Sequence, residues 1–230
     1  MILKDIYFQV NPVEYADRDD DRLYARDASR HICNYLGRSL RELKFESNGY
    51  NRIVFNGFKN PDNPANYPDN QFGINSAKAL VVPVKFDLDE FKRLGATEIS
   101  NFFYSLLTDG LKMAAKFENI PLDAVLSALD LLRKGNYINS WIFKKKNFMA
   151  GTIKCSLVCS MDLSNFHLRL TIELKSNVVF DKEILTTAPD EISYYRKFND
   201  IVLSGNEVFV LDYFKEPIFK TVLPALPTSI

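Results

Sequence analysis

The clearest pattern in this chain is an alternation of apolar and polar residues in its C-terminal third. The segments 153–161 and 166–174 each carry an apolar side chain at every second position, which is the period of a half-buried β-strand. The residues between them are turn formers. Pairing the last residue of the first segment with the first residue of the second keeps both apolar sets on one face. The same register places Lys154 opposite Glu173, which predicts an antiparallel hairpin with a favourable cross-strand charge pair.

Further alternating segments follow this hairpin. Strands are expected near 178–185, 200–203 and 207–213. The last two are joined by a tight turn at Ser204–Asn206, and a short helix is expected to begin near Pro189.

The middle of the chain has a helical period instead. Apolar residues recur at i, i+3, i+4 and i+7 from Ile99 to Phe117, with Thr97 as the candidate N-cap. Gly110 falls on the same stripe, where it would let another element approach closely. A second helix is expected to begin at Pro121 and to end at Gly135. Together they predict a helical hairpin with a buried seam.

The first part of the chain predicts a strand, a helix and two further strands. The first strand covers residues 2–10, and the helix covers about 20–36 with Gly37 as its C-cap. The later strands are expected at 51–59 and 78–86.

These elements define the expected fold class. Helices and antiparallel hairpins are segregated along the chain, which is typical of an α+β fold. We expect a central antiparallel helical hairpin packed against antiparallel β-hairpins or an antiparallel sheet, with an N-terminal strand–helix–strand region. Pro83 cannot donate to a sheet ladder, so its strand is expected at an edge or a bulge. The chain is expected to be a single domain over 1–230, with a possible subdivision into 1–87 and 88–230.

Composition and charge narrow the function classes. Lys plus Arg and Asp plus Glu both total 29, so the net charge is zero and general nucleic-acid binding is disfavoured. The uncharged runs are about half the ~20 residues that a membrane helix needs, and no signal-peptide pattern opens the sequence. Cys33, Cys155 and Cys159 form no CxxC pair, which favours a reducing compartment and buried thiols. The expected location is the cytoplasm.

The stretch "DRDDDRLYARDASRH" at 17–31 is the one concentrated group of acids. An EF-hand loop needs glycine at its sixth position and glutamate at its twelfth, whereas Arg22 and Ala28 stand there when the loop is started at Asp17. A calcium loop is therefore excluded. Asp27 and His31 are four residues apart, a spacing that can hold a transition metal or orient a base on one helix face.

Two interpretations of this stretch remain open. Acids at a helix start interact favourably with the helix dipole, and alternating Asp and Arg form a solvated, mutually paired surface. The alternative is a metal-dependent hydrolase or nuclease, whose ligands and catalytic groups would be Asp17, Asp19, Asp21, Asp27 and His31.

Recognisable catalytic motifs are missing from the sequence. It contains no GxGxxG, GxxxxGK[ST], GxSxG or HExxH pattern. We therefore assign no catalytic residue, no cofactor and no resident metal, and the main hypothesis is that the protein is not an enzyme.

Two stretches resemble a family of bacterial cytoplasmic proteins. They are "LLTDGLKMAAKFENIPLDAVLSALDLLRKGNYINSWIFKKKNF" and "TAPDEISYYRKFNDIVLSGNEVFVLDYF". In pattern and layout they are similar to immunity proteins of polymorphic and contact-dependent toxin systems, over roughly residues 100–215. The resemblance implies a protein that binds one cognate toxin domain and neutralises it. The resemblance does not assign a functional role to any residue of this chain.

The expected partner contacts come from three surfaces. Residues 60–75 form a loop rich in asparagine and proline, whose aromatics could anchor an interface. The acidic helix start and the polar face of the hairpin are the other two. The expected contacts are Asn63, Tyr67, Asn70, Phe72, Asp17, Asp19, Asp20, Asp21, Lys154, His167, Arg169 and Glu173. A structural or assembly component is the third hypothesis, and the oligomeric state is left open.

Overall fold

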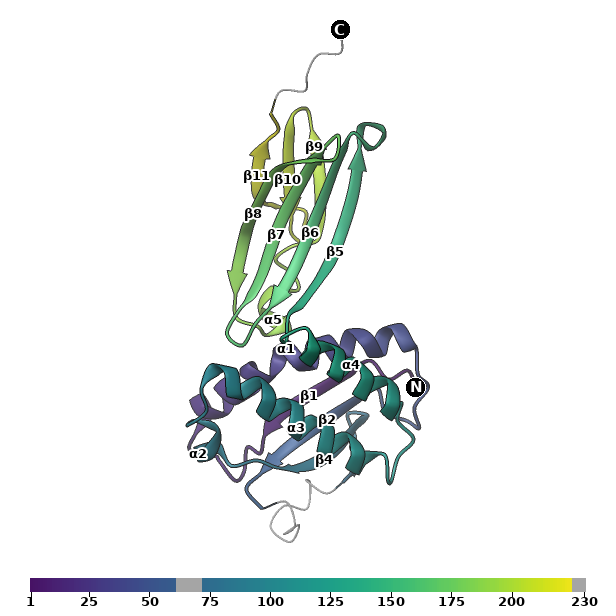
Figure 1. The fold of residues 1–230 in the computed structure, drawn as a ribbon, viewed down its shortest axis with the longest axis vertical. Helices are drawn as coiled ribbons and strands as arrows, with labels where there is room; N and C mark the ends of the chain where they lie inside the picture. The colour runs from purple at the N-terminus through teal and green to yellow at the C-terminus, as the bar shows by residue number, and fades with distance from the viewer. Residues whose placement is uncertain (61–71, 225–230) are drawn as a thin grey trace. The chain divides into compact units, whose positions relative to one another are not determined.

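The computed structural model describes residues 1–60 and 72–224 (Figure 1). The chain divides into two compact units, Met1–Asn139 and Ser140–Ile230. The division falls after the central helices and not at 87/88, because those helices pack with the N-terminal strands and helix. The β-rich remainder forms the second unit by itself. The expected α+β class is confirmed, and the central helices pack on elements of the N-terminal part of the chain.

The first unit contains a four-stranded sheet in the order β1-β2-β4-β3. Its strands are β1 Asp5–Val10, β2 Arg52–Phe58, β3 Gly73–Ile74 and β4 Ala79–Lys85. The first three in spatial order are parallel, and β3 is antiparallel to β4. The parallel register aligns Phe8, Phe55 and Val82 across the sheet, and all three are buried.

Pro83 lies at the open edge of this sheet, as the sequence predicted. It pairs with Asn56 of β2 on one side, while β3 covers only Leu80 and Val81 on the other. The Phe86 N–H donates to Phe58 O, and Ala79 O accepts from Asn75 N, which shows that odd-numbered residues of β4 turn their backbone groups away from β2. The missing N–H of Pro83 therefore faces outward and costs the ladder no hydrogen bond.

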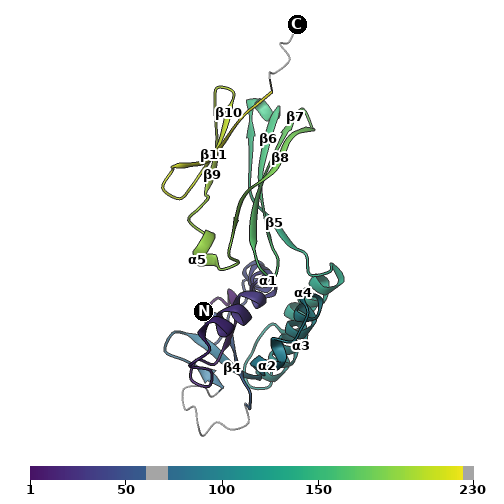
Figure 2. The same ribbon diagram turned by 90° about the vertical axis from the view of Figure 1, so that its left-hand side faces the viewer.

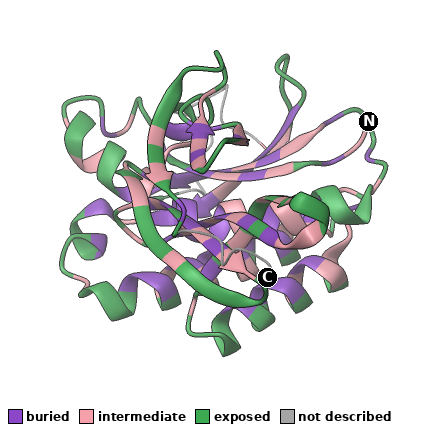
Figure 3. Ribbon diagram, turned by 90° about the horizontal axis from the view of Figure 1, so that it is seen from above, coloured by how far each residue is buried: buried purple, intermediate pink, exposed green. Residues whose placement is uncertain are grey.

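The helices of the first unit are buried along one side and exposed along the other (Figure 3). Their bounds are α1 Asp19–Leu43, α2 Leu88–Phe91, α3 Ala96–Ala114 and α4 Leu122–Lys134.

Helix α1 is longer than the sequence predicted. Gly37 is not its C-cap, since the helix continues to Leu43 and ends at Lys44 in the left-handed region with φ of 51°. Gly37 instead lies where α1 crosses β1, and a Cβ built there would be 3.4 Å from Lys4 O and 3.7 Å from Asp5 Cα. The glycine permits close approach of the two backbones. In a sequence, a glycine with this role cannot be distinguished from a glycine that ends a helix.

Helices α3 and α4 confirm the predicted pair, with corrections at the ends. Thr97 lies inside α3, which begins after Gly95, whose N–H donates to the Glu98 carboxylate at 2.8 Å. Phe117 lies beyond the helix end and is exposed. Gly110 does allow close approach, because a Cβ there would be 2.5 Å from the Phe55 ring.

A buried polar cluster fixes the end of the first unit to α1. The side-chain amide of Asn139 donates to His31 O at 2.7 Å, and the Arg38 guanidinium donates to Asn139 Oδ1. The His31 ring nitrogen Nε2 lies 3.2 Å from Ser100 Oγ on α3. These contacts join α1, α3 and the start of β5 around side chains that would otherwise be buried without partners.

The second unit contains two antiparallel sheets that face one another (Figure 2). One sheet has the order β5-β6-β7-β8, with β5 Asn139–Phe148, β6 Ile153–Met161, β7 Phe166–Leu174 and β8 Asn177–Thr187. The other has the order β11-β10-β9, with β9 Asp200–Ser204, β10 Glu207–Leu211 and β11 Pro217–Val222. The short helix α5, Glu191–Tyr194, precedes β9 and confirms the helix expected near Pro189.

The predicted hairpin is confirmed residue by residue. Met161 pairs with Phe166 and Lys154 pairs with Glu173 in an unbroken β6–β7 ladder. Strands β5 and β11 were not predicted. Strand β5 carries three consecutive lysines and has no regular alternation, and β11 follows a turn that the sequence pattern did not reveal.

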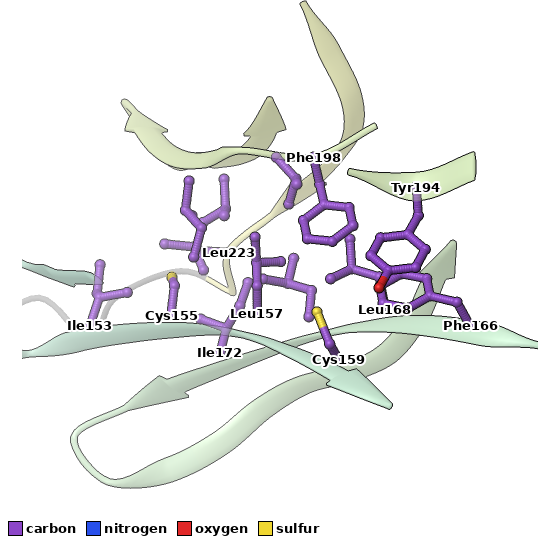
Figure 4. Packing of buried hydrophobic residues seen from close by; sticks show 14 of the residues in the cluster. Ile153, Cys155, Leu157, Cys159, Phe166, Leu168, Ile172, Tyr194, Phe198 and Leu223 are labelled. Carbon is purple, nitrogen blue, oxygen red and sulfur yellow. The ribbon is translucent and has the colours of Figure 1, made fainter. Parts of the chain in front are cut away.

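The core of the second unit lies between its two sheets (Figure 4). Tyr194 and Phe198 stack on Phe166, with ring centroids 3.8 and 5.5 Å away. Cys155 and Cys159 are buried thiols on the inner face, as expected, and burial raises the pKa of Cys155 to about 11. A thiol that stays protonated at neutral pH is a packing group and not a nucleophile.

Candidate protein-binding surface

Four large apolar side chains are exposed on two neighbouring segments of the second unit. Ile192 and Tyr195 belong to α5 and the residue that follows it, and Tyr213 and Phe214 lie in the turn between β10 and β11. Ile192 is 80% exposed, Tyr213 is 59% exposed and Phe214 is 63% exposed, whereas large apolar groups normally lose most of their surface on folding. We call these four residues the α5–turn surface.

Hydrogen bonds hold the aromatic turn in one conformation. One oxygen of the Asp212 carboxylate accepts from the Phe214 N–H at 2.8 Å and from the Glu216 N–H at 2.9 Å. The Asp212 N–H donates to Glu216 O at 2.9 Å. These hydrogen bonds order the turn backbone before any partner binds. Binding through the two exposed rings would therefore cost little further backbone entropy.

A backbone hydrogen bond joins the turn to the segment after α5. The Tyr213 N–H donates to Arg196 O at 3.1 Å. The Arg196 guanidinium lies 5.0 Å from the ring centroid of Tyr195, and the Tyr213 and Phe214 centroids are 5.6 Å apart in an edge-to-face arrangement. Tyrosine and arginine are among the side chains most enriched at the energetic centres of protein interfaces.

None of the partner contacts expected from the sequence lies on the α5–turn surface. Its aromatics lie within or beside segments that were predicted to be strand and helix, where an apolar ring is usually a core residue. One signal in the sequence could have revealed them. The pair Tyr213-Phe214 stands between the acids Asp212 and Glu216, and this pattern favours a turn over a strand.

The acid-rich stretch is the beginning of α1, as one of the two interpretations held. The helix starts at Asp19, and Asp19–Asp21 occupy its first turn. Asp21 is bound by Lys92 and Arg18, and their hydrogen bonds lower the pKa of its carboxyl group. Asp19 is paired with Arg22, while Asp17 and Asp20 are exposed and form no ion pair with the residues that the structure describes.

The alternative metal site is not formed. His31 is 2% exposed, and its ring nitrogens contact Ala28 O at 2.9 Å and Ser100 Oγ at 3.2 Å, so both face into the core. Asp27 is paired with Arg26 instead. Within residues 1–60 and 72–224, no three His, Cys, Asp or Glu side chains are grouped so that they could hold a metal ion. The predicted ligands share a stretch of sequence but not a point in space.

The polar face of the hairpin carries paired charges. Arg169 binds the Asp181 carboxylate of β8 through Nη2 at 2.9 Å, and this guanidinium lowers the pKa of that carboxyl group. Lys154 and Glu173 are opposite one another in the register. His167 lies between two carboxylates, at 3.0 Å from Asp162 and 2.9 Å from Glu183.

The loop residues of the predicted contact set are mostly not placed. Asn63, Tyr67 and Asn70 lie outside the described residues. Phe72 is half-buried, and its ring centroid is 5.0 Å from that of Phe117. This ring pair gives Phe72 a packing contact within the first unit.

Comparison with known proteins adds no relative. No family model, no curated protein and no solved structure matches this chain. No helix among the described residues is both long and apolar enough to cross a membrane.

Proposed function

We propose that this chain is a non-catalytic protein-binding module, an immunity-type inhibitor that binds and neutralises a cognate bacterial toxin. The α5–turn surface is the observation that carries the proposal, since four exposed apolar groups on adjoining, hydrogen-bonded segments favour burial against another protein. The resemblance of residues 100–215 to immunity proteins suggests that this partner is a toxin domain. The proposed site of action is the cytoplasm.

The exposed acids at the start of α1 give the proposed module a negatively charged surface that could attract a basic partner. Asp17 and Asp20 are exposed carboxylates without ion-pair partners in the described part of the chain. Carboxylates of this kind speed the approach of a basic partner more than they strengthen the final complex. We therefore assign affinity to the apolar surface and association rate to the acids.

Substitution of the turn aromatics tests the proposal. Tyr213→Ala and Phe214→Ala are each expected to weaken binding of the proposed cognate toxin domain by about 1–2 kcal/mol, because buried aromatics dominate interface energy. The measurement is calorimetric titration of purified chain into an inactivated toxin domain.

The matched control is Leu131→Ala, which removes a comparably exposed apolar group from α4. This control is expected to leave the affinity unchanged. If both turn variants bind as tightly as the wild type, the α5–turn surface is not the interface.

A further inference from the structure

His167 lies in an unusual position on the outer face of the hairpin. Its Nδ1 is 2.9 Å from Glu183 Oε2 on β8, and its Nε2 is 3.0 Å from Asp162 Oδ2 in the β6–β7 turn. The side chain is 24% exposed, so it is neither fully buried nor freely solvated. One imidazole therefore connects the turn of one hairpin to the neighbouring edge strand.

The number of N–H donors that the two contacts require indicates the protonation state of His167. A carboxylate only accepts hydrogen bonds, so each ring nitrogen must carry a proton to bind its carboxylate. A neutral imidazole has one N–H and would leave a lone pair against a carboxylate oxygen. The geometry is satisfied only by the imidazolium, which donates on both sides in charge-assisted hydrogen bonds.

We propose that His167 is a pH-sensitive latch: its imidazolium holds the Asp162–Asn165 turn to β8, and loss of one proton releases one of the two carboxylates. The latch therefore controls how firmly one end of an edge strand is held. This inference is independent of the proposed toxin binding.

The surrounding groups preserve both carboxylates as anions. Asp162 also accepts from the Ser164 and Asn165 N–H groups at 2.8 Å each, and Glu183 accepts from the Thr186 hydroxyl. Arg169 lies beside His167 on the same face of β7 and adds a positive charge near Glu183. From β6, the residue opposite His167 is Ser160, which carries no charge.

The direction of the pKa shift of His167 also favours the imidazolium. Burial by itself lowers the pKa of the imidazole, but the hydrogen bond to Asp162 and the charge of Glu183 outweigh burial and raise the pKa above its ordinary value of 6.5. A group with a raised pKa in the folded state stabilises the fold fully below the unfolded value. That stabilisation is lost as the pH rises through the folded value.

Nuclear magnetic resonance of the full chain tests the latch directly. The chain has only two histidines, His31 and His167, so His167→Gln assigns both imidazole signals. We expect His167 to titrate above pH 6.5 and the amides of β8 around Glu183 to lose hydrogen-exchange protection across that titration, after correction for intrinsic exchange.

Two kinds of variant make the test specific. Glu183→Gln and Asp162→Asn are each expected to lower the pKa of His167, whereas Glu207→Gln, on the other sheet, is expected to leave it unchanged. The latch is overturned if His167 titrates at or below pH 6.5. It is also overturned if β8 protection has the same pH dependence in the wild type and in His167→Gln.

Discussion

At the scale of single residues, the packing around Gly110 leaves no room for a side chain, because the Phe55 ring lies where its Cβ would be. Gly110 was predicted to permit close packing because it lies on the apolar stripe of its helix, and it does so against Phe55. Gly37 was predicted to end a helix and instead lies at a helix–strand crossing. Sequence periodicity reports which face a residue occupies, but it does not report what approaches that face.

Gly110→Ala is expected to destabilise the first unit by about 1–3 kcal/mol. A Cβ at this position would lie 2.5–2.6 Å from two atoms of the Phe55 ring and 3.0 Å from Val84, so the core must shift to accept it. Chemical denaturation measures the loss.

Gly135→Ala is the matched control for that substitution. Its φ is −83°, and a Cβ there would meet only ordinary contacts at 3.4 Å or more. We expect a change within about 0.5 kcal/mol at this position. Equal stability of Gly110→Ala and the wild type would show that α3 does not pack on β2 as described.

Asp200 gives the second unit an acid-sensitive bridge between its sheets. Lys146 and Lys144 of β5 donate to its carboxylate at 2.9 and 3.0 Å. Burial alone would raise the pKa of Asp200, but the two ammonium groups lower it to about 2. The stabilisation is therefore present above the unfolded pKa of about 4 and is lost as the pH falls towards 2.

Asp200→Asn is expected to cost about 1 kcal/mol or less at neutral pH, because the three side chains are partly exposed. The difference in unfolding free energy between wild type and variant should shrink between pH 4 and pH 2. A difference that stays constant over this range would mean that the bridge contributes nothing.

At the scale of elements, prediction succeeded where two independent signals agreed. The β6–β7 register satisfied both the apolar alternation and the Lys154–Glu173 charge pair, and a shift by one residue would have broken both. Strand β5 offered neither signal. Its lysines 144 and 146 reach across to Asp200 of the other sheet, a contact that no local pattern reveals.

Phe166→Ala is expected to destabilise the second unit by about 3–5 kcal/mol, since the ring is fully buried and stacks with Tyr194 and Phe198. Val158→Ala, on the outer face of the same hairpin, serves as the control and should cost far less. Thermal and chemical unfolding of both variants measure the contrast. Similar losses for the two would contradict the assignment of inner and outer faces.

At the scale of the whole molecule, the sequence indicated the fold class but not the division of the chain. The boundary at 139/140 follows from packing of α3 on β4 and of α4 on α1, long-range contacts that local periodicity does not encode. The candidate surface was missed for a related reason. Exposed and buried aromatics have the same local pattern, and the fold alone separates Tyr213 and Phe214 from the core rings Tyr194 and Phe198.

The most direct test of the proposed function is inhibition of the cognate toxin by the purified chain. We expect toxin activity to fall to background at one molar equivalent, with a one-to-one complex in light scattering and a dissociation constant near nanomolar, about −12 kcal/mol. Unchanged toxin activity in the presence of a large molar excess of the chain, with no complex formed, would contradict the assignment of this protein as an immunity-type inhibitor.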